Sequence, residues 1–263
     1  MDIGQLFSLE GRIALVTGGS RGIGAMIVEG FLAAGCARVY ISARKADQIA
    51  EAVARFGDRV IGLPHDLSTV EGCRALAADI AARETRLDIL VNNAGAAWGE
   101  PFETFGEAGW DRTMDINVKS PFFLTQALHG LLKAAAREGQ PAKVINIGSI
   151  DGQRLNPWDT YAYHASKAAI LWLTKRMAAR LITDHIVVTA IAPGAFPSTM
   201  NKAARDHGDA VAQRIPARRV GVAEDMAAAA IYLASRAGDY VVGDTLTVDG
   251  GLVHADCKTS IDG

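Results

Sequence analysis

Short runs of valine, isoleucine and leucine recur along the chain and alternate with alanine-rich segments. The runs cover residues 13–17, 38–42, 60–64, 89–92, 143–147, 186–192 and 245–248. Most of them are continuously apolar, which is typical of strands covered on both faces in a parallel sheet. The segments between them, such as 70–83, 161–183 and 223–235, have the character of helices. The pattern predicts one α/β domain over residues 1–263, with a doubly wound parallel sheet of about seven strands flanked by helices.

A glycine-rich turn separates the first strand from the first long helix. Residues 17–25 read Thr-Gly-Gly-Ser-Arg-Gly-Ile-Gly-Ala, between the apolar runs 13–16 and 26–32. Glycine lets a backbone approach a ligand closely, and the free N–H groups at a helix start attract negative charge. Gly18, Gly22 and Gly24 give the spacing Gly-x-x-x-Gly-x-Gly, which differs from the common Gly-x-Gly-x-x-Gly fingerprint. The turn predicts a bound dinucleotide, with a ligand-free glycine turn as the alternative.

Composition narrows the range of partners. The 263 residues are 49% apolar and 21% charged, and the formal net charge is −2. This near balance argues against a general nucleic-acid or membrane-surface binder. No apolar run approaches the ~20 residues of a membrane span, and residues 1–5 lack the features of a signal peptide. Cys36, Cys73 and Cys257 have no metal-ligand spacing and cannot all pair, so we expect free thiols in a cytoplasmic protein without a metal.

Polar residues and glycines follow several of the predicted strands. They include residues 92–95 after the fourth strand, 148–149 after the fifth and 193–194 after the sixth. In a doubly wound sheet the ligand lies beyond the carboxyl ends of the strands, so these loops should meet at one site. The Ser149 hydroxyl can hydrogen-bond a substrate carbonyl or alcohol. Asn117 could relay protons through a water molecule or anchor a lysine.

Tyr163 and Lys167 lie four residues apart in the predicted helix 161–183, so both side chains project from one face of it. A free tyrosine has a pKa of ~10. A nearby ammonium favours the phenolate and lowers that pKa toward the working range, which suits acid–base chemistry. The alternative is a chance pair on an amphipathic helix. Tyr161 has Ala165 four residues on instead of a lysine, so we expect it to be a packing residue.

Together these motifs resemble the short-chain dehydrogenase/reductase family over essentially the whole chain. The matching stretches, in family order and at family spacing, are 17–24, 92–95, Asn117, Ser149, 163–167, 193–194 and 249–251. The resemblance implies a single Rossmann-type domain that moves hydride between a nicotinamide and a carbonyl or alcohol. It also implies a homotetramer, with a homodimer as the alternative.

The resemblance implies a role for each catalytic residue. Tyr163 matches the general acid/base, and Lys167 matches the residue that lowers the tyrosine pKa and bonds the nicotinamide ribose. Ser149 matches the hydroxyl that orients the substrate, and Asn117 matches the proton-relay asparagine. Ser149 and Tyr163 are 14 residues apart, one more than is common in the family, so the loop 150–160 should carry an extra residue.

The end of the second predicted strand favours NADP(H) over NAD(H). It reads Ile-Ser-Ala-Arg-Lys at residues 41–45, without the acidic residue that usually bonds the ribose 2′-hydroxyl in NAD sites. Arg44 could bind a 2′-phosphate bidentately, and Arg21 could approach it from the glycine turn. The alternative for Arg44 is a solvated residue that opens the following helix.

The resemblance extends the cofactor site to further positions. Asp66 matches the residue that caps the adenine amino group, with a helix N-cap as the alternative. Phe196 and Ser198 match positions that contact the nicotinamide carboxamide, and the alternative for Phe196 is an aromatic side chain packed on the core. The complete predicted set is Gly18, Ser20, Arg21, Gly22, Ile23, Gly24, Arg44, Asp66, Leu67, Asn93, Ala94, Gly95, Tyr163, Lys167, Pro193, Gly194, Phe196 and Ser198.

The substrate pocket should lie among the loops that follow residues 95, 149 and 194. Its predicted lining residues are Trp98, Asp151, Trp158 and Met200, with Phe102 and Arg154 in the same loops. Aromatic and methionine side chains favour contact with a ring or an acyl chain. Asp151 and Arg154 could face a polar substrate, or could simply pair with each other in water.

Local details resemble one subgroup of the family, the NADPH-dependent 3-ketoacyl reductases associated with bacterial rhamnolipid synthesis. They include Asn-Asn-Ala-Gly-x-x-Trp-Gly at 92–99, Val-Ile-Asn-Ile-Gly-Ser at 144–149 and Tyr-Ala-Tyr-x-x-Ser-Lys at 161–167. We therefore expect an NADP(H)-dependent reductase of 3-ketoacyl or related ketones. The alternative enzyme is an NAD(P)-dependent dehydrogenase of a polyol or a cyclic alcohol. A non-catalytic dinucleotide-sensing protein often lacks the tyrosine or the lysine, and both are present here.

Overall fold

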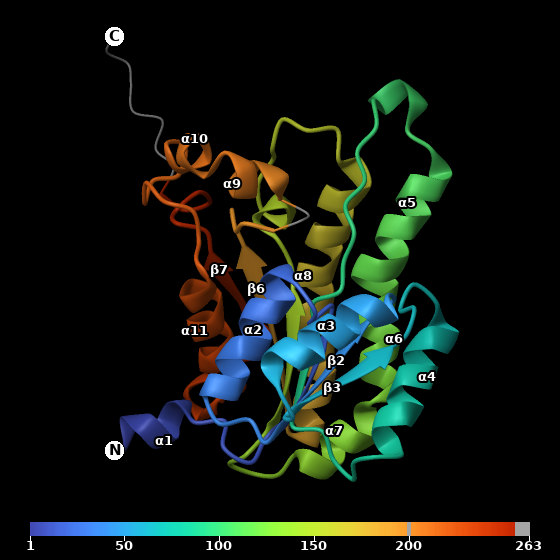
Figure 1. The fold of residues 1–263 in the computed structure, drawn as a ribbon, viewed down its shortest axis with the longest axis vertical. Coiled ribbons are helices and arrows are strands. Elements are labelled where there is room, and N and C mark those ends of the chain that lie inside the picture. Colours follow the sequence, from blue (N-terminus) through green and yellow to red (C-terminus); the bar gives the residue numbers. More distant parts are fainter. Residues whose placement is uncertain (199–200, 256–263) are drawn as a thin grey trace.

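Seven parallel strands form one sheet in the computed structural model, which describes residues 1–198 and 201–255. The strand order is β3-β2-β1-β4-β5-β6-β7, so the order reverses between β1 and β4. Figure 1 labels β2, β3, β6 and β7 of this sheet. The bounds are β1 Ile13–Thr17, β2 Arg38–Ala43, β3 Val60–Pro64, β4 Ile89–Asn92, β5 Ala142–Ile147, β6 Ile186–Pro193 and β7 Thr245–Val248. This is the predicted doubly wound sheet, which places a ligand crevice beyond the carboxyl ends of β1 and β4.

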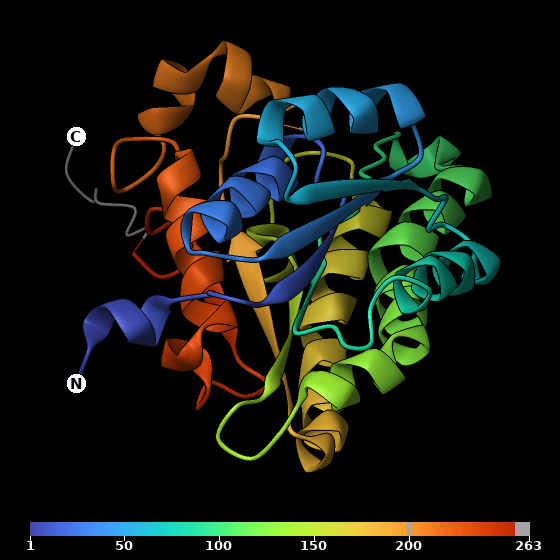
Figure 2. The ribbon, with the colours of Figure 1, turned by 60° about the horizontal axis from the view of Figure 1, so that its bottom comes forward.

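Helices cover both faces of the sheet (Figures 1 and 2). One buried cluster joins the sheet to α2 (Gly22–Ala33), α3 (Ala46–Phe56) and α11 (Ala223–Ala234). The opposite cluster joins it to α4 (Val70–Ala81), α6 (Ser120–Ala127), α7 (His129–Ala135) and α8 (Tyr161–Leu181). The other elements are α1 (Ile3–Phe7), α5 (Glu107–Met114), α9 (Lys202–Asp206), α10 (Gly208–Ala212), η1 (Phe102–Thr104), η2 (Asp115–Lys119), η3 (Ile150–Gly152), η4 (Ile182–Asp184) and η5 (Arg236–Gly238).

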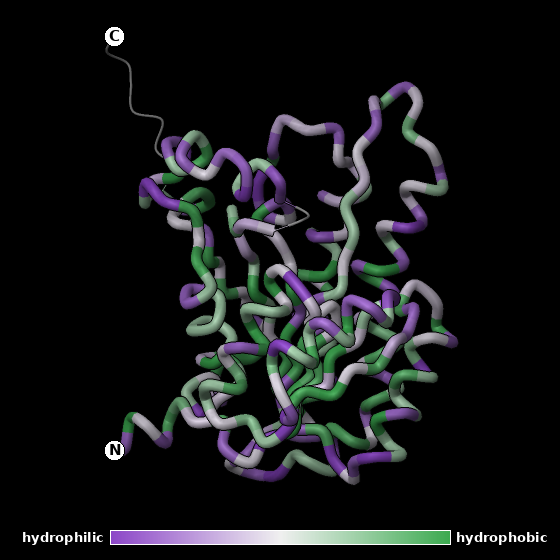
Figure 3. Tube along the Cα trace, in the orientation of Figure 1, coloured by the Kyte–Doolittle hydropathy of each residue, from purple (hydrophilic) through white to green (hydrophobic). Residues whose placement is uncertain are grey.

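The strand predictions are confirmed to within one residue. Four strands have the predicted bounds, and β2, β5 and β6 are each one residue longer. The predicted burial on both faces is wrong for β3 and β7, which are only partly buried. These two strands form the edges of the sheet, where a neighbouring strand covers one side alone. Figure 3 shows the hydrophobic positions gathered along the strands at the centre and the hydrophilic ones in the outer loops.

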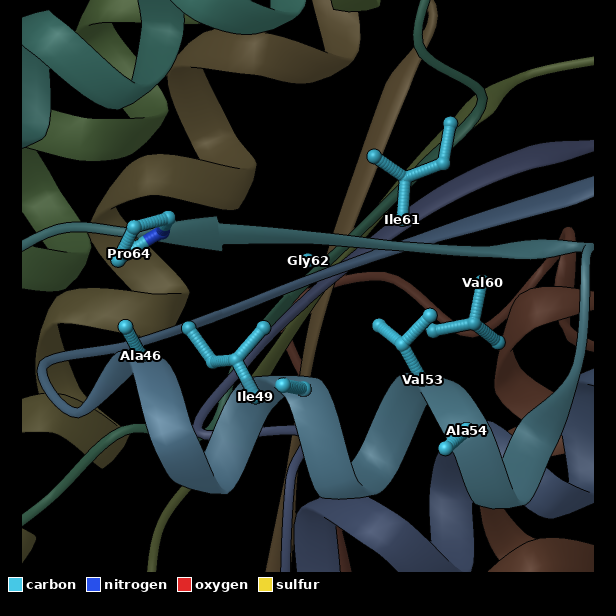
Figure 4. A pocket seen from close by; sticks show the side chains of 9 residues that line it. Ala46, Ile49, Val53, Ala54, Val60, Ile61, Gly62 and Pro64 are labelled. Carbon is cyan, nitrogen blue, oxygen red and sulfur yellow. The ribbon is translucent and has the colours of Figure 1, made fainter.

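An apolar groove runs between α3 and the edge strand β3 (Figure 4). Gly62 makes room for Ile49, because a Cβ at Gly62 would lie 2.0 Å from Ile49 Cγ2. Val53 of α3 and Val60 of β3 continue the lining. The lining includes none of the predicted site residues, so this groove is separate from the candidate site.

Other expectations concern thiols, metals and membranes. Cys36 and Cys73 are buried free thiols, and Cys257 lies outside the described residues. Within residues 1–198 and 201–255 there is no group of His, Cys, Asp and Glu side chains that could hold a metal ion. No helix in those ranges is long and apolar enough to cross a membrane.

Buried amides tie the carboxyl ends of the two central strands to the helices behind them. The Asn92 side-chain amide on β4 donates to Asn146 Oδ1 on β5 at 2.9 Å and to the Thr125 hydroxyl on α6 at 3.2 Å. The Asn146 amide donates in turn to the Thr174 hydroxyl on α8 at 2.9 Å. All four side chains are 5% exposed or less, so water cannot replace a lost partner. The network fixes the two strand ends that carry the candidate site.

We expect Asn146→Ala to lower the free energy of unfolding by about 2–3 kcal/mol. The substitution removes one acceptor and two donors from a buried network and leaves Asn92 short of a partner. Chemical denaturation followed by circular dichroism measures the change. The exposed Gln126→Ala on α6 is the control and should change stability by less than about 0.5 kcal/mol. Equal stability of the two variants would contradict the structural importance of the network.

Candidate active site

The glycine-rich turn joins β1 to α2 and has no space for larger residues. Gly18 and Gly22 have φ angles of 65° and 54°, in the left-handed region that favours glycine. A Cβ on Gly24 would lie 2.3 Å from the Gly18 carbonyl oxygen. Among the described residues no side chain caps the start of α2, which leaves the N–H groups of its first turn for a ligand. The other predicted residues here, Ser20 and Ile23, are partly buried.

Hydrogen bonds join this turn to the loop after β4. The Thr17 hydroxyl oxygen accepts from the backbone N–H groups of Asn93 and Ala94, each at 2.9 Å. The Asn93 side-chain amide donates to the carbonyl oxygens of Thr17 at 2.7 Å and Gly18 at 3.3 Å. The two loops are therefore fixed together where the strand order reverses. The role of Thr17 is not apparent from the sequence, in which it is only the last residue of a strand.

Arg44 lies in the short connection between β2 and α3. It is exposed and directly follows the last residue of β2, whereas α3 begins at Ala46 with Lys45 as its N-cap. Arg44 thus precedes the N-cap of α3, and its exposure suits the alternative of a solvated residue at the helix start as well as a ligand contact. An exposed guanidinium at this strand end is free to reach a ligand at the edge of the sheet.

Asp66 lies in the corresponding loop after β3, beside Arg44. Its carboxylate accepts hydrogen bonds from the backbone N–H of Ser68 at 3.0 Å and the Ser68 hydroxyl at 2.8 Å. The N-cap of α4 is Thr69, so the alternative of a helix N-cap at Asp66 is wrong. Burial opposes ionisation, but the bonds from Ser68 and the charge of Arg44 hold the pKa of Asp66 below its ordinary value. Leu67, the next residue, is buried.

Arg21 places a second exposed cation near the end of β2. The turn lies against this strand, because a Cβ on Gly19 would lie 2.6 Å from Ile41 Cγ2. A shallow pocket separates the turn from α3, and its lining consists of Ser20, Arg21, Gln48, Glu51, Ala52 and Arg55. Arg21 lines this pocket and Arg44 directly follows β2, so a shared 2′-phosphate site for the two cations stays a prediction.

Ser149, Tyr163 and Lys167 converge beyond the carboxyl end of β5. Ser149 follows β5 and is 7% exposed, and Lys167 on α8 is 6% exposed. Lys167 Nζ lies 5.6 Å from the centroid of the Tyr163 ring, so the helical spacing brings the two together as predicted. Lys167 Nζ also donates a hydrogen bond to the Ile147 carbonyl oxygen at 2.9 Å. This backbone contact fixes the lysine, and the sequence contains no signal for it.

Burial dominates the pKa values of the tyrosine and the lysine. Burial raises the pKa of Tyr163 to about 12, a hydrogen bond with Ser149 opposes the rise, and the charge of Asp151 adds to it. Burial lowers the pKa of Lys167 to about 8, against the charge of Asp151. Burial shifts both pKa values toward the neutral forms because both groups lie out of water. Lys167 is not among the groups that shift the pKa of Tyr163 here, so the lowering of that pKa by Lys167 stays a prediction. The phenol keeps its proton at neutral pH and can donate it.

Asn117 lies in η2, a π-helical turn between α5 and α6. Its side-chain oxygen accepts from the Ala96 N–H at 2.9 Å, and its amide donates to the Ala96 carbonyl at 2.8 Å. The same amide donates to the Ser166 hydroxyl on α8 at 2.9 Å. The side chain therefore ties the loop after β4 to α8 and makes no hydrogen bond to Lys167. Anchoring of the lysine by this side chain is wrong, and the proton-relay role stays a prediction.

The loop after β6 packs on both the core and the glycine turn. Phe196 is 2% exposed and belongs to the buried cluster under α2 and α11. The alternative of a core aromatic is therefore confirmed, and its side chain is not available to a nicotinamide. Ser198 lies against the turn, where a Cβ on Gly22 would be 3.4 Å from Ser198 Cβ. Pro193 ends β6 and Gly194 follows it, as predicted.

The predicted substrate residues have different surroundings. A Cβ on Gly109 of α5 would lie 2.4 Å from Trp98 Cδ1, and the Arg112 guanidinium lies 5.4 Å from the Trp98 ring centroid. Trp98 therefore packs on α5, whereas Trp158 is 62% exposed. Met200 lies outside the described residues.

Phe102, Asp151 and Arg154 are the remaining residues of the predicted substrate loops. The Phe102 and Tyr161 rings meet edge to face with centroids 5.6 Å apart, which confirms Tyr161 as a packing residue. Arg154 donates to the Leu252 carbonyl oxygen at 2.5 Å, and the structure shows no ion pair between it and Asp151. The alternative that these two charges pair with each other is therefore wrong.

Comparisons with known proteins agree with this arrangement. A family model described as enoyl-(acyl carrier protein) reductase matches residues 18–253. The rhamnolipids biosynthesis 3-oxoacyl-[acyl-carrier-protein] reductase of Pseudomonas aeruginosa is 47% identical over 94% of this chain and 98% of its own length. A 2-dehydro-3-deoxy-D-gluconate 5-dehydrogenase of Dickeya dadantii is 36% identical over 93% of this chain and 96% of its own. The solved Pseudomonas aeruginosa RhlG/NADP active-site complex has a TM-score of 0.90 and 46% identity, over 94% of this chain and 98% of that one.

The family model spans strands β2 to β7, the glycine turn from Gly18 onward and the residues around Ser149 and Tyr163. The relatives are oxidoreductases of carbonyl or alcohol groups by name, and they match this chain along nearly its whole length. The chain therefore belongs to the short-chain dehydrogenase/reductase family and is an oxidoreductase that acts on CH–OH and C=O groups.

Proposed function

We propose that this protein is an NADP(H)-dependent reductase of 3-ketoacyl or related ketone substrates. The observation that carries the proposal is the convergence of Ser149, Tyr163 and Lys167, with a protonated phenol, beyond the carboxyl end of β5. The name of the 47% identical relative, a 3-oxoacyl reductase, supports the substrate class. The NADP complex of a structural neighbour with 46% identity supports the cofactor.

The residues at the sheet edge fit NADP(H). The start of α2 has no side-chain cap among the described residues and follows a glycine turn, which suits a pyrophosphate. The exposed Arg44 and Arg21 would hold a 2′-phosphate, because guanidinium groups bind phosphate bidentately. Asp66 would bond the adenine amino group, and Lys167 would bond the nicotinamide ribose. A carboxylate at the end of β2 would disfavour the 2′-phosphate, and that strand end has none.

The chain's own residues account for the proton transfer. The Ser149 and Tyr163 hydroxyls would bond the substrate carbonyl oxygen and fix the position of its carbon. Bound NADPH supplies the hydride. Tyr163 Oη would donate its proton to the developing alkoxide, since burial raises its pKa to about 12 and keeps the phenol protonated. The Ile147 carbonyl holds Lys167 Nζ near the ring, where a cation stabilises the phenolate that remains.

We expect Arg44→Ala to raise KM for NADPH about tenfold or more and to change KM for NADH less than threefold. A charge-assisted contact to phosphate contributes about 1.5–3 kcal/mol, and NADH has no 2′-phosphate to lose. Lys45→Ala is the matched control, because Lys45 is the exposed neighbouring cation. Steady-state rates at 340 nm with both cofactors measure the effect. Equal losses with NADPH and NADH would contradict a 2′-phosphate contact.

The substrate class is tested with a panel of 3-ketoacyl thioesters, diketones, cyclic ketones and keto sugars. Oxidation of NADPH with a 3-ketoacyl thioester as the preferred substrate supports the proposal. Turnover confined to sugars or cyclic ketones would favour the alternative, an NAD(P)-dependent dehydrogenase of a polyol or cyclic alcohol. The name of the 36% identical gluconate relative supports that alternative. A non-catalytic dinucleotide sensor would turn over none of the panel.

The proposal includes a cytoplasmic homotetramer, with a homodimer as the alternative. Large apolar side chains on the surface of neighbouring helices support self-association. They are Trp110 on α5, Phe122 on α6 and Trp172 on α8, which are 42%, 38% and 72% exposed. The helices α5 and α6 flank Asn117, and α8 carries Tyr163. Association through these helices would therefore stabilise the positions of both residues.

A further inference from the structure

Asp151 has a fixed place beside the catalytic residues. It is the middle residue of η3, which begins directly after Ser149. Its backbone N–H donates to the Ser149 hydroxyl oxygen at 3.1 Å. Gly152 allows η3 to pack closely against α8, because a Cβ at Gly152 would lie 2.6 Å from the backbone carbonyl carbon of Lys167. Backbone contacts on both sides therefore hold Asp151 next to Ser149 and the helix that carries Tyr163.

The Asp151 carboxylate has no bonded partner within residues 1–198 and 201–255. Among the described residues, no group donates a hydrogen bond to it and no cation forms an ion pair with it. Arg154, three residues later, is directed to the Leu252 carbonyl oxygen at 2.5 Å. Asp151 as a whole is only partly buried. A ligand that covers this carboxylate should donate a hydrogen bond to it, or should at least carry no negative charge next to it.

The charge of Asp151 reaches the groups that would hold the substrate. Burial raises the pKa of Tyr163 to about 12 and lowers that of Lys167 to about 8, and the charge of Asp151 acts upward on both values. A carbonyl bonded by Ser149 and Tyr163 would lie in the same field. The Asp151 carboxylate would therefore repel a negative charge close to the reacting carbon, which it would not do to a neutral group.

Building on the proposed function, we infer that Asp151 selects the substrate by charge: the site takes 3-ketoacyl groups whose carboxyl is esterified and rejects free 3-keto acids. In a free 3-keto acid the carboxylate is separated from the reacting carbon by one methylene. Its charge would then lie within several ångströms of the Asp151 carboxylate. Repulsion of this kind lowers affinity roughly tenfold to a hundredfold in a partly buried site. A thioester or an ester has no such charge.

Methyl acetoacetate and acetoacetate are the probes, because they differ only in esterification. The readout is the ratio of their kcat/KM values with NADPH, for the wild type and for Asp151→Asn, which keeps the size of the side chain and removes its charge. We expect the ester-to-acid ratio to fall about tenfold or more in Asp151→Asn, mainly through a lower KM for acetoacetate. Calorimetric titration of both compounds into protein saturated with NADP⁺ should show the same relative gain in affinity for the acid.

Asp159→Asn is the matched control for net charge. Asp159 belongs to the same loop, is exposed and accepts a hydrogen bond from the Tyr161 hydroxyl at 2.7 Å. Its loss should leave the ester-to-acid ratio unchanged. An unchanged ratio in Asp151→Asn, or the same fall in Asp159→Asn, overturns the inference while the proposed function stands. Absence of both binding and reduction of the ester by the wild type would overturn the proposed function and the inference together.

Discussion

Replacing Tyr163 with phenylalanine is expected to lower kcat for ketone reduction by about a hundredfold to ten-thousandfold. The substitution removes the hydroxyl proposed as the proton donor, and general acid catalysis contributes about this much. The pKa of Tyr163, raised to about 12 by burial, keeps the hydroxyl protonated across the neutral range, so its loss should be felt at every pH from 6 to 9. The ring remains, and with it the packing against Lys167.

Tyr161→Phe is the control for this experiment. Tyr161 lies two residues earlier on the same helix and bonds only Asp159 with its hydroxyl. Its variant should keep kcat within about twofold. Binding of NADPH, followed by fluorescence, should persist in both variants, because the glycine turn and the arginines are untouched. Full turnover by Tyr163→Phe would remove the tyrosine from the mechanism.

The strand ends of this fold are readable from the sequence because each is marked by a change of residue type. Val91 and Asn92 end a buried strand, and the sequence then changes to Asn93, Ala94 and Gly95. The hydrophobic runs thus predict the strands to within a residue. They do not predict which strands lie at the edges, because strand order depends on crossovers between distant segments. The partial exposure of β3 and β7 follows from that order and not from their composition.

The proximity of the candidate catalytic residues was predictable from their spacing, but their electrostatics were not. A separation of four residues places Lys167 near Tyr163, and the structure confirms this. It does not reveal that both side chains are withdrawn from water, or that the ammonium is directed to the Ile147 carbonyl. Burial depends on the whole assembled sheet, so only the structure gives the direction of the two pKa shifts.

For some residues the sequence allowed two roles, and the structure was needed to distinguish between them. Asp66 and Phe196 each suited a cofactor contact or a structural role, and composition could not decide between them. The structure removes the N-cap role from Asp66, since Thr69 caps α4, and places the Phe196 side chain in the core. Asn117 illustrates a third case, because the π-helical turn that points it at Ala96 and Ser166 has no signature in a single sequence.

The buried lysine leads to a prediction about stability and pH. Burial lowers the pKa of Lys167 from 10.5 to about 8, against the charge of Asp151. In the unfolded chain the ammonium keeps its ordinary pKa, so between pH 8 and 10.5 the unfolded state binds a proton that the native state has released. Stability rises with pH wherever the unfolded state binds more protons. Lys167 therefore costs the native state stability at neutral pH, and this cost disappears as the pH rises.

We expect the free energy of unfolding of the wild type, relative to Lys167→Met, to increase by about 2–3 kcal/mol between pH 7 and pH 10. Methionine fills a similar volume without a charge, and Tyr163 is present in both proteins, so its own titration largely cancels. Urea denaturation without added nucleotide, repeated along the pH range, measures the difference. Lys175→Met, which removes an exposed lysine of the same helix, should show a difference that is flat with pH. A flat difference for Lys167→Met as well would mean that the lysine is solvated, and the phenolate-stabilising role would then need a different electrostatic basis.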